Sequence, residues 1–144
     1  MNTEENKAIS RRGIEEAWNK GNLSIIDEVI VPDIVIHDLG NPAGEIRGRE
    51  AVKAQRVMFC TAFPDLHLTI EDTIAEGDEV MVRFTARGTH LGELLGIAPT
   101  GKQVVVTGIA IDRYADGKVV EGWGYFDRLS LLQHLSMIPQ GLER

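Results

Sequence analysis

The sequence has only one cysteine, Cys60, and no long run of apolar residues. A single cysteine excludes an internal disulfide and a thiolate metal cluster. No segment approaches the ~20 apolar residues of a transmembrane helix. The N-terminal stretch MNTEENKAIS is polar and acidic, without the apolar core of a signal peptide. We therefore expect a soluble, cytoplasmic protein that has no membrane partner.

Positive charge is also scarce. The chain has 15 Lys and Arg residues against 22 Asp and Glu residues, which gives a formal net charge of −7 and a pI near 5.1. This balance argues against binding to nucleic-acid phosphates or to an anionic membrane surface. The four histidines are scattered and show no HxH or HExxH spacing, so we predict no metal site.

Motifs for cofactors and nucleophiles are missing as well. No GxGxxG follows an expected strand, and no GxSxG signature is present. The segment RGTHLGELLGIAPTGK, residues 87–102, contains PTGK but lacks the complete phosphate-loop pattern. PTGK is therefore weak evidence for a nucleotide site. This segment is unusually apolar for a connection between strands, which suits a lid or a subunit contact.

The residues that are present predict one α+β domain spanning residues 1–144, in which 43% hydrophobic residues are enough for a core. Helical patterns cover residues 3–20, 22–31 and 48–63, and residues 34–40 form a short strand pattern. Pro32 is expected to end the second helix. Four β-rich runs follow at 66–77, 78–90, 102–117 and 118–127, and a short helix pattern closes the chain at 129–135. Helices followed by an antiparallel sheet favour a curved, mainly antiparallel sheet with the N-terminal helices on one face, forming a cone-shaped barrel around a small-molecule pocket.

The turn Asp116-Gly117 between the last two β-rich runs allows two registers. A two-residue loop pairs Ala115 with Lys118 and sets Asp112 opposite Glu121, which is unfavourable because both are acidic. A left-handed bulge at Gly117 pairs Tyr114 with Lys118 instead. We prefer the second register because its cross-strand pairs are a salt bridge and two large apolar pairs, Arg113–Glu121, Ile111–Trp123 and Ile109–Tyr125.

The preferred register separates small residues from aromatic ones. One face carries Gly108, Ala110, Gly122, Gly124 and Phe126, and if this face is concave it leaves room for a ligand. The same pocket is expected to include Met58, Phe59 and Phe84. The other face carries Trp123 and Tyr125, which suits packing or the interface of a homodimer. The alternative is that the glycines only permit the sheet to twist.

Three residues are candidates for proton-transfer chemistry. His37 and Asp38 are neighbours on a strand, so only one of them can point into the cone. An Asp in an apolar pocket is a suitable general base, and a His can act as acid or base. The alternative is a surface Asp in a turn beside a hydrogen-bonded His. His90 follows the end of a strand, where it can hang over the entrance of the cone.

Most of the chain, from Trp18 to Leu135, resembles the SnoaL-like polyketide cyclases, also called predicted ester cyclases, of the nuclear transport factor 2-like superfamily. The motifs that carry the resemblance are FPD, GTHxG, PTGK, ADGK and ExWxxxDxxxLLQ. The resemblance implies a cone-shaped barrel, a deep hydrophobic pocket, a homodimer or higher oligomer, and no metal or organic cofactor. Characterised cyclases of this family close a polyketide ring by intramolecular aldol condensation.

The same resemblance implies where a catalytic Asp and His of the cyclases would lie. By matching IAIDRYADGKVVEGWG, those positions fall at or near Ala110 and Gly124, so neither side chain is present. The segment VIHDLGNPAGEIRGREAV also resembles the part of ketosteroid isomerases that holds the Asp base, and Asp38 matches that residue. Asp38 is therefore the leading candidate base, and His37 or His90 is the candidate partner.

The sequence is compatible with three functions. The first is an enzyme for cyclisation, isomerisation or related proton transfer on a hydrophobic carbonyl compound. The second is a small-molecule binding protein of the same fold without catalysis, because the cyclase acid–base pair is absent. The third is an interaction module that uses the aromatic outer face.

Overall fold

Six strands form one open, curved sheet in the order β2-β1-β6-β5-β4-β3 in the computed structural model, which describes residues 2–41 and 44–136. All neighbouring strands are antiparallel except β1 and β6, which are parallel. The strands are β1 (Ile30–Asp38), β2 (Glu45–Arg47), β3 (His67–Glu76), β4 (Glu79–Thr89), β5 (Gln103–Ala115) and β6 (Lys118–Phe126). The four β-rich runs predicted after Pro64 are thus confirmed.

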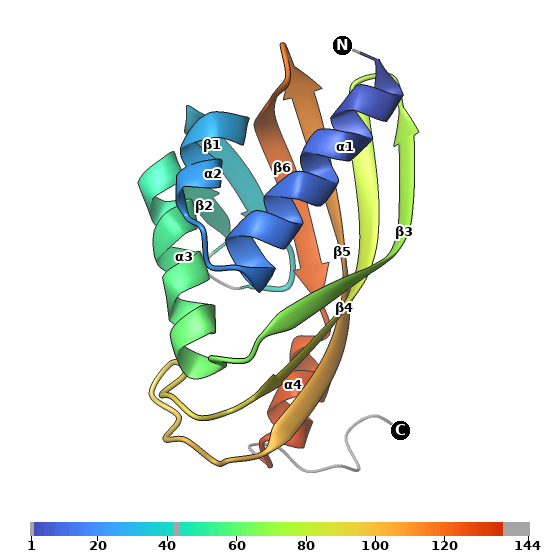
Figure 1. Ribbon diagram of the computed structural model, residues 1–144. Helices are drawn as coiled ribbons and strands as arrows, with labels where there is room; N and C mark the ends of the chain where they lie inside the picture. The colour runs from blue at the N-terminus through green and yellow to red at the C-terminus, as the bar shows by residue number, and fades with distance from the viewer. Residues whose placement is uncertain (1, 42–43, 137–144) are drawn as a thin grey trace.

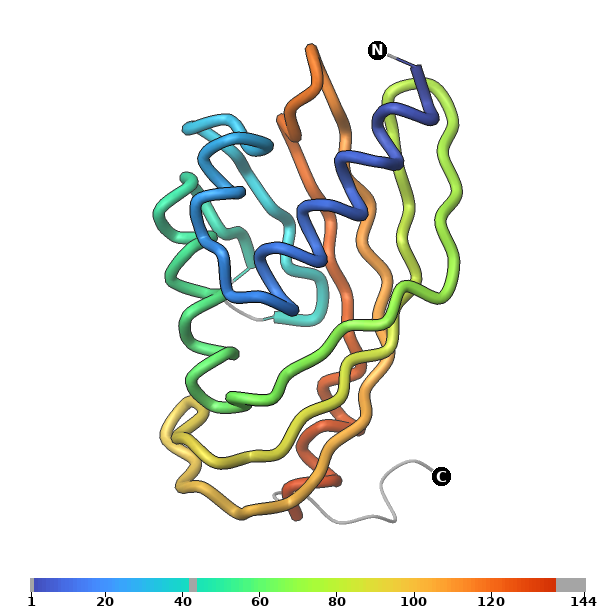
Figure 2. Tube along the Cα trace, in the orientation of Figure 1, coloured from blue at the N-terminus to red at the C-terminus, as the bar shows by residue number. Residues whose placement is uncertain are grey.

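The helices lie mainly against one face of this sheet. They are α1 (Thr3–Ile14), a π-helical turn η1 (Glu15–Asn19), α2 (Ser24–Val29), α3 (Arg49–Ala62) and the C-terminal α4 (Arg128–His134). Figure 1 shows α1 crossing the curved sheet beside α2 and α3, and the trace in Figure 2 shows the same arrangement. The predicted α+β fold is therefore confirmed. None of the described helices is long and apolar enough to cross a membrane.

The first strand begins earlier than the sequence suggested. The prediction that Pro32 ends the second helix is wrong, because α2 already ends at Val29 and Pro32 lies inside β1. The register between β1 and β6 shifts between Ile30 and Val35, so the proline sits where the regular ladder is interrupted. The strand β2 was not predicted, since it has only three residues and no alternating pattern.

The last hairpin confirms the preferred register over most of its length but not at its turn. Arg113 pairs with Glu121, and the two large apolar pairs form as expected. The turn is nevertheless the two-residue form, with Ala115 opposite Lys118, so the predicted Tyr114–Lys118 pair is wrong. In a regular ladder that pair would also have placed Arg113 opposite Val119 and not opposite Glu121. A bulge between Arg113 and Tyr114 absorbs the extra residue in β6. Asp116 (φ 51°) and Gly117 (φ 78°) both have positive φ, as the favoured tight hairpin turn requires.

Candidate functional site

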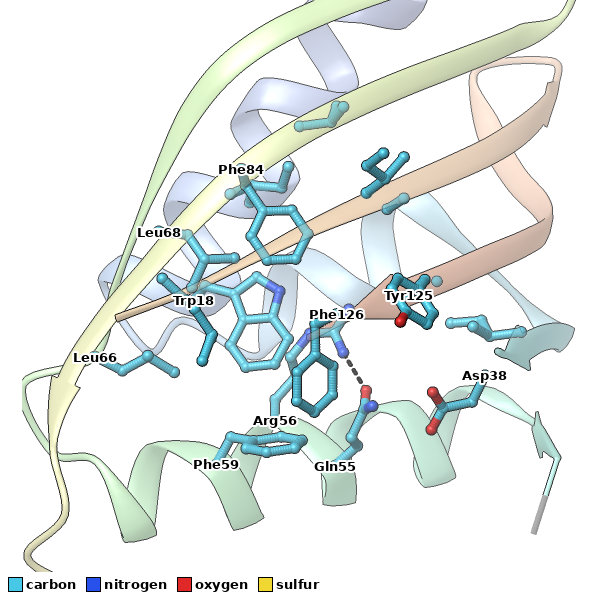
Figure 3. A pocket seen from close by; sticks show the side chains of 18 of the residues that line it. Trp18, Asp38, Gln55, Arg56, Phe59, Leu66, Leu68, Phe84, Tyr125 and Phe126 are labelled. Atoms are coloured by element: carbon cyan, nitrogen blue, oxygen red, sulfur yellow. Dashed lines mark hydrogen bonds between the residues drawn. The ribbon is translucent and has the colours of Figure 1, made fainter. Parts of the chain in front are cut away.

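A cavity of about 200 Å³ lies between the concave face of the sheet and the helices α1, η1 and α3. Aromatic side chains form much of its wall. Trp18 and Phe59 have ring centroids 6.1 Å apart, and Phe59 meets Phe126 edge to face at 5.9 Å. Figure 3 shows these rings and Phe84 gathered around one space. The site is therefore an apolar pocket into which only a few polar groups project.

The π-helical turn η1 places the tryptophan of this wall. Asn19, its last residue, donates from Nδ2 to the Leu68 carbonyl (3.0 Å) and accepts from the Leu68 amide (2.7 Å). These two bonds fix the end of the first helical segment to strand β3. Trp18, the preceding residue, borders the cavity together with Leu68. Single π-helical turns are often found at functional sites.

Five of the residues expected to line a pocket border this cavity, namely Phe59, Phe84, Ala110, Gly124 and Phe126. Met58, Gly108 and Gly122 do not border it. A Cβ at Gly108 would lie 2.4 Å from the Phe84 ring, and one at Gly122 would lie 2.6 Å from the Asp112 carboxylate. These two glycines therefore make room for neighbouring side chains and not for a ligand.

Gly124 is the glycine that leaves open space in the wall. It pairs directly with Ala110, and a Cβ built on it would meet nothing within 4 Å. Its neighbours Trp123 and Tyr125 pair with Ile111 and Ile109 on the other face of the sheet. Both residues also border the cavity. The two positions implied for a cyclase acid–base pair thus form a small, uncharged part of the wall.

Arg56 of α3 brings a positive charge to this apolar cavity. Its guanidinium lies 4.2 Å from the centroid of the Trp18 ring, and its Nη1 donates to Gln55 Oε1 at 2.5 Å. Its Nε is buried and has no hydrogen-bond partner in the part of the chain that the structure describes. Burial lowers the pKa of Arg56 to about 10, although the nearby Asp112 opposes this shift. The side chain still carries its positive charge at neutral pH.

Asp112 of β5 borders the same cavity from the sheet. Burial raises the pKa of its carboxyl group to about 6, and the positive charge of Arg56 limits the shift. No ion pair within 4 Å joins Asp112 to Arg56, and among the described residues the carboxylate has no hydrogen-bond partner. A carboxyl group that titrates near neutral pH inside an apolar pocket is suited to accept and return a proton.

Asp38 also borders the cavity, at the end of β1. Arg128 Nη2 donates to its Oδ1 at 2.6 Å, and Asn41 Nδ2 donates to its Oδ2 at 2.9 Å. The Arg128 guanidinium lies in turn 4.3 Å from the centroid of the Phe126 ring. Both carboxylate oxygens of Asp38 are therefore already engaged, and the residue ties the end of β1 to α4.

His37 and His90 do not border the cavity. His37 stacks on Trp123 with ring centroids 5.4 Å apart, and its Nε2 lies 2.7 Å from Glu121 Oε2. It belongs to the outer face of the sheet, since adjacent strand residues point in opposite directions. His90 is fully buried at the start of the loop before β5, where its Nδ1 meets the Thr100 hydroxyl at 3.0 Å. The structure thus brings neither histidine to Asp38.

The loop that contains His90 is attached to α3. The amides of Leu91 and Gly92 donate to the Ala62 carbonyl, at 3.0 and 3.1 Å. Gly92 is required there, because a Cβ would lie 2.3 Å from the Thr61 carbonyl oxygen. Leu94 is buried, whereas Leu91 and Leu95 are exposed. None of the residues between β4 and β5 borders the cavity.

Sequence reasoning missed Arg56 and Asp112, although each position carried a signal. Asp112 alternates with Gly108 and Ala110 along β5, so it belongs to the concave face in the preferred register. Arg56 follows Val52 by four residues and precedes Phe59 by three, which places it on the inward side of α3. Within residues 2–41 and 44–136, no cluster of His, Cys, Asp and Glu could hold a metal ion.

Comparisons with known proteins agree on one family. The family model described as SnoaL-like polyketide cyclase matches residues 8–135. The chain is 28% identical over 130 residues to aklanonic acid methyl ester cyclase DauD of Streptomyces sp. (strain C5), covering 86% of this chain and 78% of DauD.

Solved structures agree with the sequence matches. The crystal structure of AclR, a proposed hydroxylase from Streptomyces galilaeus, has a TM-score of 0.85 and 36% identity, covering 96% of this chain and 85% of AclR. That of IdmH, a proposed polyketide cyclase from Streptomyces antibioticus, has a TM-score of 0.77 and 33% identity, covering 91% and 98% of the two chains.

Proposed function

The chain belongs to the SnoaL-like polyketide cyclase family, and on that premise we propose that it catalyses a cyclase-type proton transfer on a hydrophobic, polyketide-like carbonyl compound. The compound binds in the apolar cavity. Asp112 is the general base and acid, and Arg56 stabilises the developing oxyanion. The observation that supports this proposal is that Asp112 and Arg56 both border the apolar cavity, where burial raises the pKa of the Asp112 carboxyl group to about 6.

The reaction begins at a carbon next to a carbonyl group. The Asp112 carboxylate removes a proton from this carbon, and the electron pair of the C–H bond moves to form an enolate. The enolate carbon then attacks a second carbonyl carbon of the same molecule, which forms the new C–C bond and leaves an alkoxide. Protonated Asp112 returns its proton to the alkoxide, so the base is restored and no other reactant is needed.

Arg56 acts on the charge that the enolate and the alkoxide carry. A guanidinium in an apolar surrounding stabilises an oxyanion more strongly than it does in water, because the local dielectric is lower. Its Nη1 donates a hydrogen bond to Gln55, and the centre of the guanidinium lies 4.2 Å from the centroid of the Trp18 ring, so these two contacts position the guanidinium before substrate binds. The aromatic wall excludes water from the enolate.

Asp112→Asn tests this assignment. We expect the variant to lose about 100-fold or more in rate, as is typical for removal of a general base. The first substrate to test is aklanonic acid methyl ester, the compound named for DauD, with cyclisation followed by mass spectrometry. Deuterium exchange from D2O into ethyl benzoylacetate, followed by proton NMR, reports the proton-removal step alone. A variant with wild-type rates in both assays would disprove the role of Asp112.

A binding protein without catalysis is the second candidate. The observation that favours it is the Ala110–Gly124 pair, which provides no acid or base at the two positions implied by the family resemblance. This function predicts that wild-type protein binds such ketones but leaves both cyclisation and deuterium exchange at the rates of buffer alone. Catalysis above buffer that depends on Asp112 excludes it.

A further inference from the structure

The two carboxylates at the cavity, Asp38 and Asp112, differ in whether a cation is paired with them. Asp38 is paired with Arg128 at 2.6 Å, so its charge is compensated locally. Arg56 also borders the cavity, and among the described residues it has no ion-pair partner within 4 Å and donates a hydrogen bond only from Nη1, to Gln55. The Nη2 group therefore remains available to a ligand. The cavity therefore holds a cation with free capacity for an anion.

From this geometry we propose that the cavity binds flat aromatic carboxylic acids of one or two rings, with the carboxylate on Arg56 and with Asp112 as a competing anion. The proposal uses the site of the proposed function but does not need its chemistry, since it concerns binding alone. The proposal also predicts that such an acid binds more tightly than an ester or amide of the same size, because these neutral compounds place no full negative charge next to Arg56.

The aromatic wall supports the flat part of such a ligand. Trp18, Phe59, Phe84 and Phe126 offer ring faces and edges around the same space. An apolar cavity of about 150 Å³ accepts benzene in another protein. The cavity of about 200 Å³ therefore has room for roughly one to two rings.

Asp112 makes this binding depend on pH. The ligand carboxylate and an ionised Asp112 would both lie near Arg56 and repel each other, whereas protonated Asp112 can donate a hydrogen bond to the ligand. The other titratable neighbours do not compete. Burial raises the pKa of the Cys60 thiol and of the Tyr114 hydroxyl, so both groups are neutral near pH 6.

The expected size of the effect follows from the titration of Asp112 near pH 6. If the ligand binds only when Asp112 is protonated, its affinity rises by up to about 30-fold between pH 7.5 and pH 5. The sign is fixed, since lowering the pH protonates Asp112 and removes the competing charge. A ligand without a negative charge gains nothing from this change.

The test compares 1-naphthoate with 1-naphthamide by isothermal titration calorimetry between pH 5 and pH 7.5. These probes have the same rings and nearly the same size, but only naphthoate is charged. We expect wild-type protein to prefer naphthoate at pH 5 and to lose this preference as the pH rises. Asp112→Asn should bind naphthoate with one affinity across the range, and Arg56→Gln should bind both probes equally.

Equal binding of the two probes to wild-type protein at pH 5 overturns the proposal and needs no variant that must fold. A naphthoate affinity whose pH dependence persists in Asp112→Asn also overturns it. The outcome is separable from that of the proposed function. If Asp112→Asn loses turnover but wild-type protein ignores naphthoate, only the present inference fails. If Asp112→Asn keeps turnover and binds naphthoate as expected, only the catalytic role fails.

Discussion

At the scale of single residues, Gly122 leaves the space that the Asp112 carboxylate occupies. The two residues pair across β5 and β6, and the carboxylate lies over the bare backbone of the glycine. Gly124, two residues further along β6, faces open space instead. The two glycines look alike in the sequence, but one holds a catalytic candidate and the other shapes the ligand space.

This difference predicts opposite effects of the same substitution. Gly122→Ala places a methyl group against the Asp112 carboxylate, so we expect a loss of about 1–3 kcal/mol in the free energy of unfolding, as for other overpacked cores. Gly124→Ala should leave stability nearly unchanged and weaken ligand binding, because its methyl group enters the cavity wall. Urea denaturation of both variants checks the pair, and equal stability losses would contradict it.

Asp112 should also make stability depend on pH. Its pKa is raised in the folded protein from the ordinary value of 3.8 to about 6. As pH rises, Asp112 therefore ionises in the unfolded chain before it ionises in the folded protein. The free energy of unfolding decreases between pH 4 and pH 6 as a result. Each pKa unit corresponds to about 1.4 kcal/mol, so the loss amounts to roughly 3 kcal/mol at most. Asp112→Asn, which cannot ionise, should gain stability over wild type between pH 4.5 and pH 7.5 in urea denaturation. A difference that stays constant with pH would contradict burial of the carboxylate.

At the scale of elements, a helix or strand could be predicted from the sequence where its own residues carry a clear periodic pattern. Strands β3 to β6 alternate over nine or more residues and are separated by glycine turns, so each was found. The three residues of β2 form a strand only because Val35, Ile36 and His37 offer them a partner. The local pattern also did not predict that Pro32 lies inside β1, because this position depends on the interrupted ladder between β1 and β6.

The tight turn between β5 and β6 gives a prediction at this scale. Asp116 has φ 51°, a conformation that a β-branched residue strongly disfavours. Asp116→Val should therefore cost about 1–2 kcal/mol in the free energy of unfolding. Ala115→Val, next to it in an extended and exposed position, is the matched control and should be nearly neutral. Thermal or urea denaturation measures both, and a neutral Asp116→Val would argue against this turn.

At the scale of the whole molecule, the outer face of the sheet carries several exposed apolar side chains. Val105 and Ile109 of β5 are each 43% exposed, and Tyr125 of β6 is 52% exposed. Trp123 and His37 lie on the same face. We propose that this face, with Trp123 and Tyr125, forms the interface of a homodimer, because an exposed apolar face of a sheet favours association.

A charge in the middle of this face should abolish such a dimer. We expect Ile109→Glu to convert the protein to monomer, as measured by size-exclusion chromatography with light scattering. Val57→Glu introduces the same charge at an exposed position of α3 and should leave the assembly unchanged. A monomeric wild-type protein, or a dimer that survives Ile109→Glu, would contradict the proposed interface.

The site as a whole was less predictable than the fold. Asp38 was found because the sequence around it resembles a known motif, but its pairing with Arg128 depends on an element 90 residues away. Arg56 and Asp112 come from α3 and β5, and neither segment alone indicates that the other lies across the cavity. A pattern of alternating residues predicts which side chains share one face of a strand. Only the packed fold shows which residues of other elements lie across the cavity from them.

The parallel pairing of β1 with β6 has a consequence for synthesis on the ribosome. The strand that carries Asp38 is synthesised before the other five strands, yet its longest pairing is with β6, the last of the six described strands to be synthesised. Arg128, which neutralises Asp38, emerges later still. A nascent chain that ends before residue 118 therefore has no partner for β1 except the short β2. The cavity is completed only after β6 and Arg128 have been synthesised, and a product truncated before β6 cannot present a finished site.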